Sequence, residues 1–86
     1  VGIEDLPITE LKLAPHPTSD IATISFANHD NHLVSINIFN SSGMLMRHDQ
    51  FVGSEYQIAK GDFVAGLYTI QLIMGDRKSE QRLIVN

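Results

Sequence analysis

The chain has 86 residues, a formal net charge of -4 at pH 7 and no cysteine. This length supports one hydrophobic core rather than two, and the lack of cysteine excludes disulfides, cysteine-based zinc sites and thiol nucleophiles. The 6 basic residues, scattered among 10 acidic ones, exclude a nucleic-acid-binding surface, and no apolar stretch approaches the roughly 20 residues of a membrane-spanning helix.

Residues 1–8 contain charged residues and a proline but no sustained hydrophobic period. We interpret them as a linker supplied by a longer parent protein, with an exposed backbone that a protease can cut. They also lack the basic region and apolar run of a signal peptide, so an export signal is expected elsewhere in the parent. The domain itself is predicted at residues 9–86.

From residue 9 onward, apolar and polar residues alternate with the period of two that is typical of a β-strand. The alternation is clearest in residues 22–26, 34–38 and 68–74. The pattern predicts seven strands, at residues 9–14, 21–26, 33–39, 44–51, 56–58, 66–74 and 77–85. Seven short strands separated by turn residues indicate an all-β fold, an immunoglobulin-like β-sandwich of about seven antiparallel strands.

Prolines and glycines separate these predicted strands. Pro15 and Pro17 end the first strand, because proline cannot donate a hydrogen bond to a β-ladder. Residues 40–43 predict a hairpin turn in which the glycine takes a positive φ. Gly75 and Asp76 are expected to form a tight primed turn between the last two strands.

The sequence contains residue types that serve in metal binding and nucleophilic catalysis, but their spacing does not suit either role. His29 and His32 are the nearest approach to a metal-ligand cluster, but they lack a third and fourth ligand at a recognisable spacing. The adjacent pairs Ser19-Asp20 and His48-Asp49 offer a hydroxyl, a base and carboxylates, but neighbouring residues on a strand point to opposite faces. The sequence therefore predicts no enzyme, no metal site and no cofactor.

Four short blocks follow one another along most of the chain. They are LAPHPTSD at residues 13–20, VSINIFNSSGML at 34–45, FVAGLYTIQL at 63–72 and EQRLIVN at 80–86. In this order and spacing they resemble the C-terminal sorting domain, type A, of the type IX secretion system (Por secretion system), which is found in cargo proteins of Bacteroidota. The resemblance covers about residues 11–86.

The first two blocks match the family through their prolines and glycine. Pro15, Pro17 and Asp20 correspond to the family's opening Tyr-Pro-Asn-Pro motif and the Asp or Asn that follows it. Gly43 corresponds to the glycine of a Gly-Arg-Leu turn. The departures from the family pattern in these blocks are Ala14, His16 and Met44.

The last two blocks match two strand motifs of the family. Gly66 and Tyr68 occupy their places in the pattern Leu-x-x-Gly-x-Tyr, with Phe63 in the Leu position. Arg82 stands for the terminal basic residue, which is followed by three aliphatic residues, Leu83, Ile84 and Val85.

The resemblance implies a non-catalytic address on a larger cargo protein. Such cargo passes through the periplasm and is recognised by the outer-membrane type IX translocon and its shuttle proteins. A cell-surface sortase then removes the domain, here by a cut in residues 1–8, and the mature cargo is attached to the outer-membrane surface or secreted.

Recognition is hypothesised to involve the terminal strand, residues 77–85. Arg82 lies there beside an aliphatic run, and a strand at or near a sheet edge can be read through its backbone and side chains. An equally weighted reading is that Leu83 and Val85 only close the core. Edge strands are also a candidate dimer interface.

Two other kinds of protein are compatible with a small β-sandwich. One is a passive immunoglobulin-like structural or adhesive module of a surface protein, which differs from a sorting domain only in the four blocks. The other is a carbohydrate-binding module, which the composition disfavours because there is no tryptophan and only 2 tyrosines and 4 phenylalanines.

Overall fold

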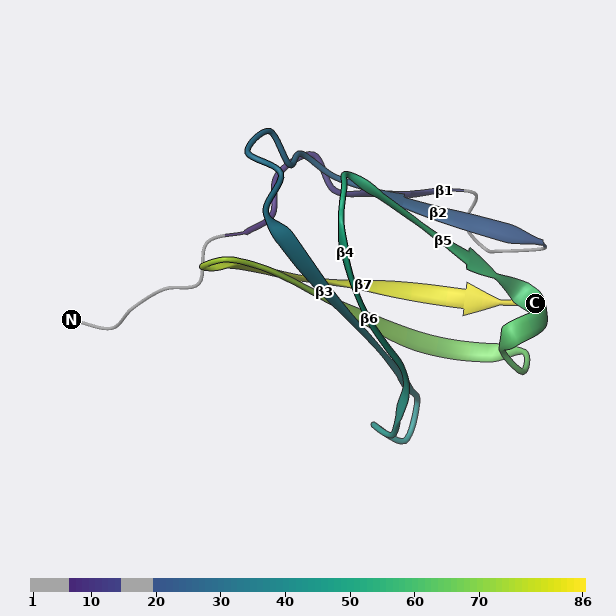
Figure 1. The fold of residues 1–86 in the computed structure, drawn as a ribbon. Helices are drawn as coiled ribbons and strands as arrows, with labels where there is room; N and C mark the ends of the chain where they lie inside the picture. Colours follow the sequence, from purple (N-terminus) through teal and green to yellow (C-terminus); the bar gives the residue numbers. More distant parts are fainter. Residues whose placement is uncertain (1–6, 15–19) are drawn as a thin grey trace.

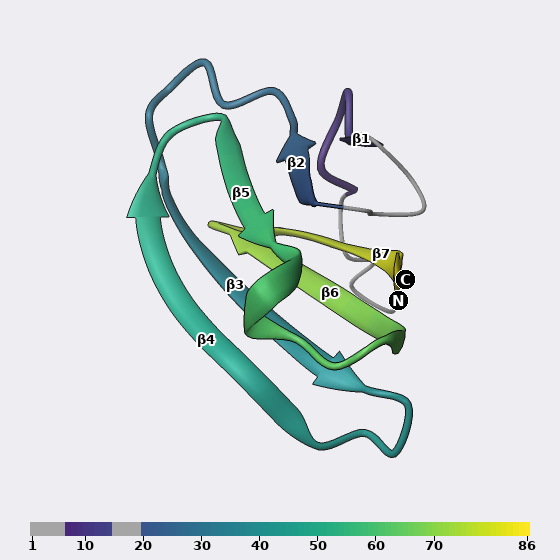
Figure 2. The ribbon, with the colours of Figure 1, turned by 90° about the vertical axis from the view of Figure 1, so that its right-hand side faces the viewer.

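The computed structural model describes residues 7–14 and 20–86, which form a sandwich of two antiparallel sheets (Figure 1). The three-stranded sheet has the order β1-β2-β5, with β1 (Lys12–Ala14), β2 (Ile21–Ser25) and β5 (Glu55–Ala59). The four-stranded sheet has the order β4-β3-β6-β7, with β4 (Leu45–Val52), β3 (Leu33–Asn40), β6 (Gly66–Met74) and β7 (Arg77–Val85). Figure 2 shows the 3-10 helix η1 (Lys60–Asp62) as the short coil between β5 and β6.

The predicted all-β sandwich is confirmed, and the strand order adds what periodicity cannot supply. β4 pairs with β3 in the four-stranded sheet, whereas the fourth strand of an antibody constant domain lies in the sheet of the first, second and fifth strands. The predicted bounds of β6 and β7 agree with the structure. The first strand was predicted from residue 9 but begins at Lys12, because Thr9 and Glu10 form a turn in which Glu10 has a φ of 57°.

The core lies between the two sheets and is built from the inward-facing residues of each strand. Alternate residues of β2, β3, β6 and the end of β7 are buried, as period two requires. The largest fully buried side chains are Ile24, Val34, Ile36, Ile38, Ile58, Ile70, Leu72 and Leu83. Each contributes about 1.5–3 kcal/mol of transfer free energy relative to exposure.

Residues 7–9, which we call the strap, are bound to the sandwich beside the start of β7. The side chain of Ile8 is only 4% exposed and belongs to the core cluster. Its backbone N–H donates to Ser79 Oγ at 2.8 Å, and Arg77 Nη1 donates to the Pro7 carbonyl at 3.0 Å. The Ala27 N–H donates to the Thr9 carbonyl at 3.0 Å. The last two residues of the predicted linker are therefore packed against the domain, and residues 1–6 lie outside the described part of the chain.

Both predicted hairpin turns form. Gly75, the first of the two residues between β6 and β7, has a φ of 63°, as a type II′ turn requires. Gly43 has a φ of 83° in the turn between β3 and β4. In that turn, Asn40 Oδ1 accepts hydrogen bonds from the N–H groups of Ser42 and Met44, at 3.0 and 2.9 Å. Pro15 and Pro17, which are predicted to end the first strand, lie outside the described residues.

Polar and aromatic contacts close one side of the sandwich between β4 and β5. The hydroxyl of Tyr56 donates to Asp49 Oδ2 at 3.0 Å, and its ring lies 5.1 Å from that of Phe51. Arg47 Nη2 donates to Asp62 Oδ2 at 2.7 Å. Burial and, less strongly, the hydrogen bond to Asp49 raise the pKa of Tyr56. These contacts connect the two sheets at a position where no backbone ladder joins them.

Candidate recognition surface

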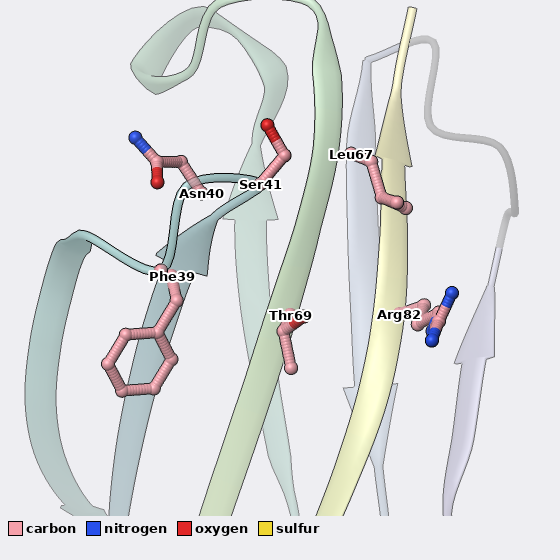
Figure 3. Close-up of a pocket in the computed structure, with 7 residues that line it drawn as sticks. Phe39, Asn40, Ser41, Leu67, Thr69 and Arg82 are labelled. Atoms are coloured by element: carbon pink, nitrogen blue, oxygen red, sulfur yellow. The ribbon is translucent and has the colours of Figure 1, made fainter.

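Three of the four sequence blocks meet at one end of the four-stranded sheet. A shallow groove of about 400 Å³ lies there, on the face that points away from the core. The β3–β4 turn, the start of β6 and the end of β7 form it (Figure 3). We call it the end groove, and its lining residues are Phe39, Asn40, Ser41, Gly43, Leu67, Thr69 and Arg82.

The register of the sheet brings these residues together. Phe39 of β3 is opposite Thr69 of β6, which is opposite Arg82 of β7. Figure 3 shows these three side chains in sequence across the neighbouring strands. On the next row toward the end of the sheet, Leu67 is opposite Ile84. Residues separated by more than 40 positions thereby form one surface.

The inward and outward residues of β7 have different environments. Leu83 and Val85 are 0% and 3% exposed and pack in the core. Arg82 is exposed on the outer face, and Ile84 is 41% exposed there. β7 is an edge strand of its sheet in the described part of the chain. The two readings of the terminal motif are therefore compatible, because one strand closes the core with one face and presents the other.

The Leu-x-x-Gly-x-Tyr block has a structural explanation. Tyr68 is 5% exposed, and its hydroxyl donates to the carbonyl of Val64 at 2.5 Å. Its ring meets that of Phe63 edge to face at 5.1 Å. A tyrosine near the start of a strand that bonds back to the preceding backbone is the tyrosine corner of immunoglobulin-like sandwiches. Gly66 is the first residue of this strand and pairs with Val85.

Arg82 supplies the only charge among the residues that line the end groove. Its side chain forms no hydrogen bond or salt bridge with any residue that the structure describes. The centre of the same outer face is different, because its polar groups bond to one another across strands. His48 Nδ1 is 2.6 Å from Asn37 Oδ1, and Asn37 Nδ2 donates to Gln71 Oε1 at 3.0 Å.

Among the other predicted site residues that the structure describes, only Gly43 lines the end groove. Gly43 supplies the positive φ of the β3–β4 turn, whereas Asp20 is exposed just before β2, in the other sheet. Sequence reasoning missed Phe39, Leu67 and Thr69, although the aliphatic side chain of Leu67 at an outward position of β6 was a usable signal.

The loop that holds His29 and His32 has no metal-site geometry. His32 Nε2 lies 3.8 Å from Asp30 Oδ2, and both side chains are largely exposed. In residues 7–14 and 20–86, no group of three or more His, Cys, Asp or Glu residues could hold a metal ion. Within the same residues, no helix has the length and apolarity needed to cross a membrane.

The fold and the surface define a small β-sandwich module with a groove at one end of its four-stranded sheet. Comparison with known families identifies the class of module. Residues 12–86 match the family described as the secretion system C-terminal sorting domain, and the chain belongs to this family. No curated protein matches the chain.

Membership of this family establishes which secretion system the chain serves. The chain is a non-catalytic C-terminal sorting signal of type IX secretion. It is part of a cargo protein that the secretion machinery recognises and carries across the outer membrane to the cell surface or the exterior. The resemblance inferred from the four sequence blocks is confirmed at this level.

Proposed function

We propose that the chain is a type A sorting domain that is read in the periplasm by shuttle proteins and the outer-membrane translocon, and is then cut from its cargo by a cell-surface sortase. The order of the four blocks supports the subgroup. The outward side chains at the end of β7 support the mode of recognition, and they are the observation that carries the proposal.

Recognition through the end of β7 would use the side chains that this strand directs away from the core. A strand that packs on one face needs apolar residues only at alternate positions, and Leu83 and Val85 meet that need. Ile84 lies between them and points away from the core, as Arg82 does. An exposed aliphatic residue beside an exposed cation is suited to contact with another protein.

The strap limits where the sortase can act on the folded domain. The backbone N–H of Ile8 is bonded to Ser79, and its side chain is buried. Cutting at this residue requires local unfolding, because a protease binds an accessible, extended backbone. The proposed cut within residues 1–8 therefore falls before Pro7.

Neither alternative is favoured by a specific observation. A carbohydrate-binding module needs exposed aromatic rings, but the exposed large hydrophobic side chains in the described part of the chain are all aliphatic or methionine. A passive structural module needs no face left for a partner, and it does not redirect a protein fused to it.

The test is a fusion of residues 1–86 behind a periplasm-targeted fluorescent protein. It is expressed in a host with a working type IX system and in an isogenic secretion-deficient strain. The proposal predicts fluorescence at the surface or in the medium of the competent host only. Retention in the periplasm of both strains, with the domain shown to be folded, contradicts it.

A further inference from the structure

We propose that the end groove binds an extended segment of the outer-membrane secretion machinery that carries a carboxylate side chain next to apolar ones. This inference rests on the proposed function and adds to it the surface that is read and the chemistry of the reader.

Three aliphatic side chains are exposed at the groove end of the outer face of the four-stranded sheet. Leu67 and Ile84 form a cross-strand pair and are 43% and 41% exposed. Leu45, which is opposite Phe39 on the same face, is 51% exposed. These side chains are partly exposed to water, and a partner that covers them gains about 25 cal/mol for each Å² of apolar surface removed from water.

Arg82 gives the groove a positive charge. It is the only charged residue of the groove, it has no partner among the described residues, and the chain as a whole carries a charge of -4. A guanidinium group binds a carboxylate with two parallel hydrogen bonds. Asn40 adds a second donor, because its Oδ1 is already occupied by the turn and its Nδ2 remains to donate.

The shape of the groove favours an extended segment. It is shallow and crosses β3, β6 and β7 at the end of the sheet, with the β3–β4 turn as one wall. Side chains of an extended chain can lie along such a surface with alternate residues in contact. A second copy of this chain is a poorer occupant, because an isologous contact brings the two Arg82 side chains toward each other.

The first experiment compares two charge reversals on the same face of the same strand. Arg82→Glu changes the groove, whereas Lys78→Glu changes an exposed residue opposite Ile73, at the other end of β7. In the reporter fusion, we expect Arg82→Glu to lower the exported fraction about tenfold or more and Lys78→Glu to leave it at the level of the unmodified fusion. The purified variants should unfold at the same urea concentration as the unmodified chain, because exposed charge reversals change stability little. Equal export of both variants overturns the proposal.

The second experiment identifies the occupant. The photo-crosslinker p-benzoylphenylalanine replaces Thr69 in the groove or Ile73 on the same outer face of β6, and cross-linked peptides are mapped by mass spectrometry in the secreting host. We expect a position-69 adduct with a machinery segment that has Asp or Glu beside apolar residues. Changing that acidic residue to Lys should restore export of Arg82→Glu.

Several outcomes of this experiment overturn the proposal. They are adducts of equal yield at both positions, an adduct with a second copy of this chain or with the cargo, and a mapped segment without a carboxylate. If the unmodified fusion stays in the periplasm of the competent host, the proposed function itself fails, so the two failures are distinguishable.

Discussion

The two ends of β7 differ in how completely the fold uses their side chains. At the start of the strand, Arg77 and Ser79 bond the strap, and Ile8 is buried beside them. At its end, Arg82 has no partner among the described residues and Ile84 is partly exposed. A strand of 9 residues separates the two ends by about 30 Å. The side chains at the start of β7 therefore hold the strap, whereas Arg82 at its end is exposed on the outer face.

The largest expected effect is a difference in stability between substitutions on the inward and outward faces of β7 at the groove end. Leu83→Ala should lower the free energy of unfolding by about 3–5 kcal/mol, because it leaves a cavity at a fully buried position. Ile84→Ala should lower it by less than about 1 kcal/mol but reduce export. Urea denaturation and the reporter fusion measure the two quantities. Similar stability losses for both variants would contradict the division of the strand into an inward core face and an outward recognition face.

The next effect concerns the strap. Ile8→Ala should lower the free energy of unfolding by about 2–3 kcal/mol, since it removes a nearly buried side chain from the core. Leu33→Ala is the matched control, because Leu33 is 55% exposed, and it should change stability by no more than about 0.5 kcal/mol. If both variants unfold at the same urea concentration, the strap is not part of the folded unit.

A smaller effect is expected at the tyrosine corner. Tyr68→Phe removes the hydrogen bond to the Val64 carbonyl and keeps the packing of the ring against Phe63. The expected loss is about 1 kcal/mol, measured by urea denaturation. No loss of stability would show that the hydroxyl contributes only to the local conformation of the strand entry.

The smallest effect is a pH dependence. Burial, followed by the hydrogen bond to Asp49, raises the pKa of Tyr56 above its ordinary value of 10.0. The resulting stabilisation is complete below pH 10 and is lost as the pH rises through the raised value. The unfolding free energy of the unmodified chain should therefore fall more steeply above pH 10 than that of Tyr56→Phe. Parallel pH profiles of the two proteins would contradict this assignment.

Local patterns were sufficient to predict most of the fold. The alternation in residues 68–74 and the Gly75-Asp76 pair predicted the β6–β7 hairpin with the observed bounds, because strand period and turn chemistry are set by neighbouring residues. The strap was not predicted, because Ile8 is a single apolar residue without a period. The hydrogen bond of Tyr68 was not predicted either, since it depends on the path of the chain before β6.

The candidate site required the tertiary structure. Arg82 and Ile84 could be selected from the terminal motif, but their outward direction depends on which face of β7 packs on the core. The end groove unites Phe39, Leu67 and Arg82 through the registers of β3 with β6 and of β6 with β7. No periodicity in the sequence states that these strands are neighbours.

The most direct test of the central claim, that the outward residues at the groove end carry the sorting signal, compares two apolar pairs on the same outer face. Leu67 and Ile84 are opposite each other at the groove end, and Leu33 and Val52 are opposite each other at the other end. Each pair is replaced by glutamines in the reporter fusion, and the exported fraction is measured. Our account predicts loss of export for Leu67→Gln with Ile84→Gln and normal export for Leu33→Gln with Val52→Gln; equal export of the two folded double variants would contradict it.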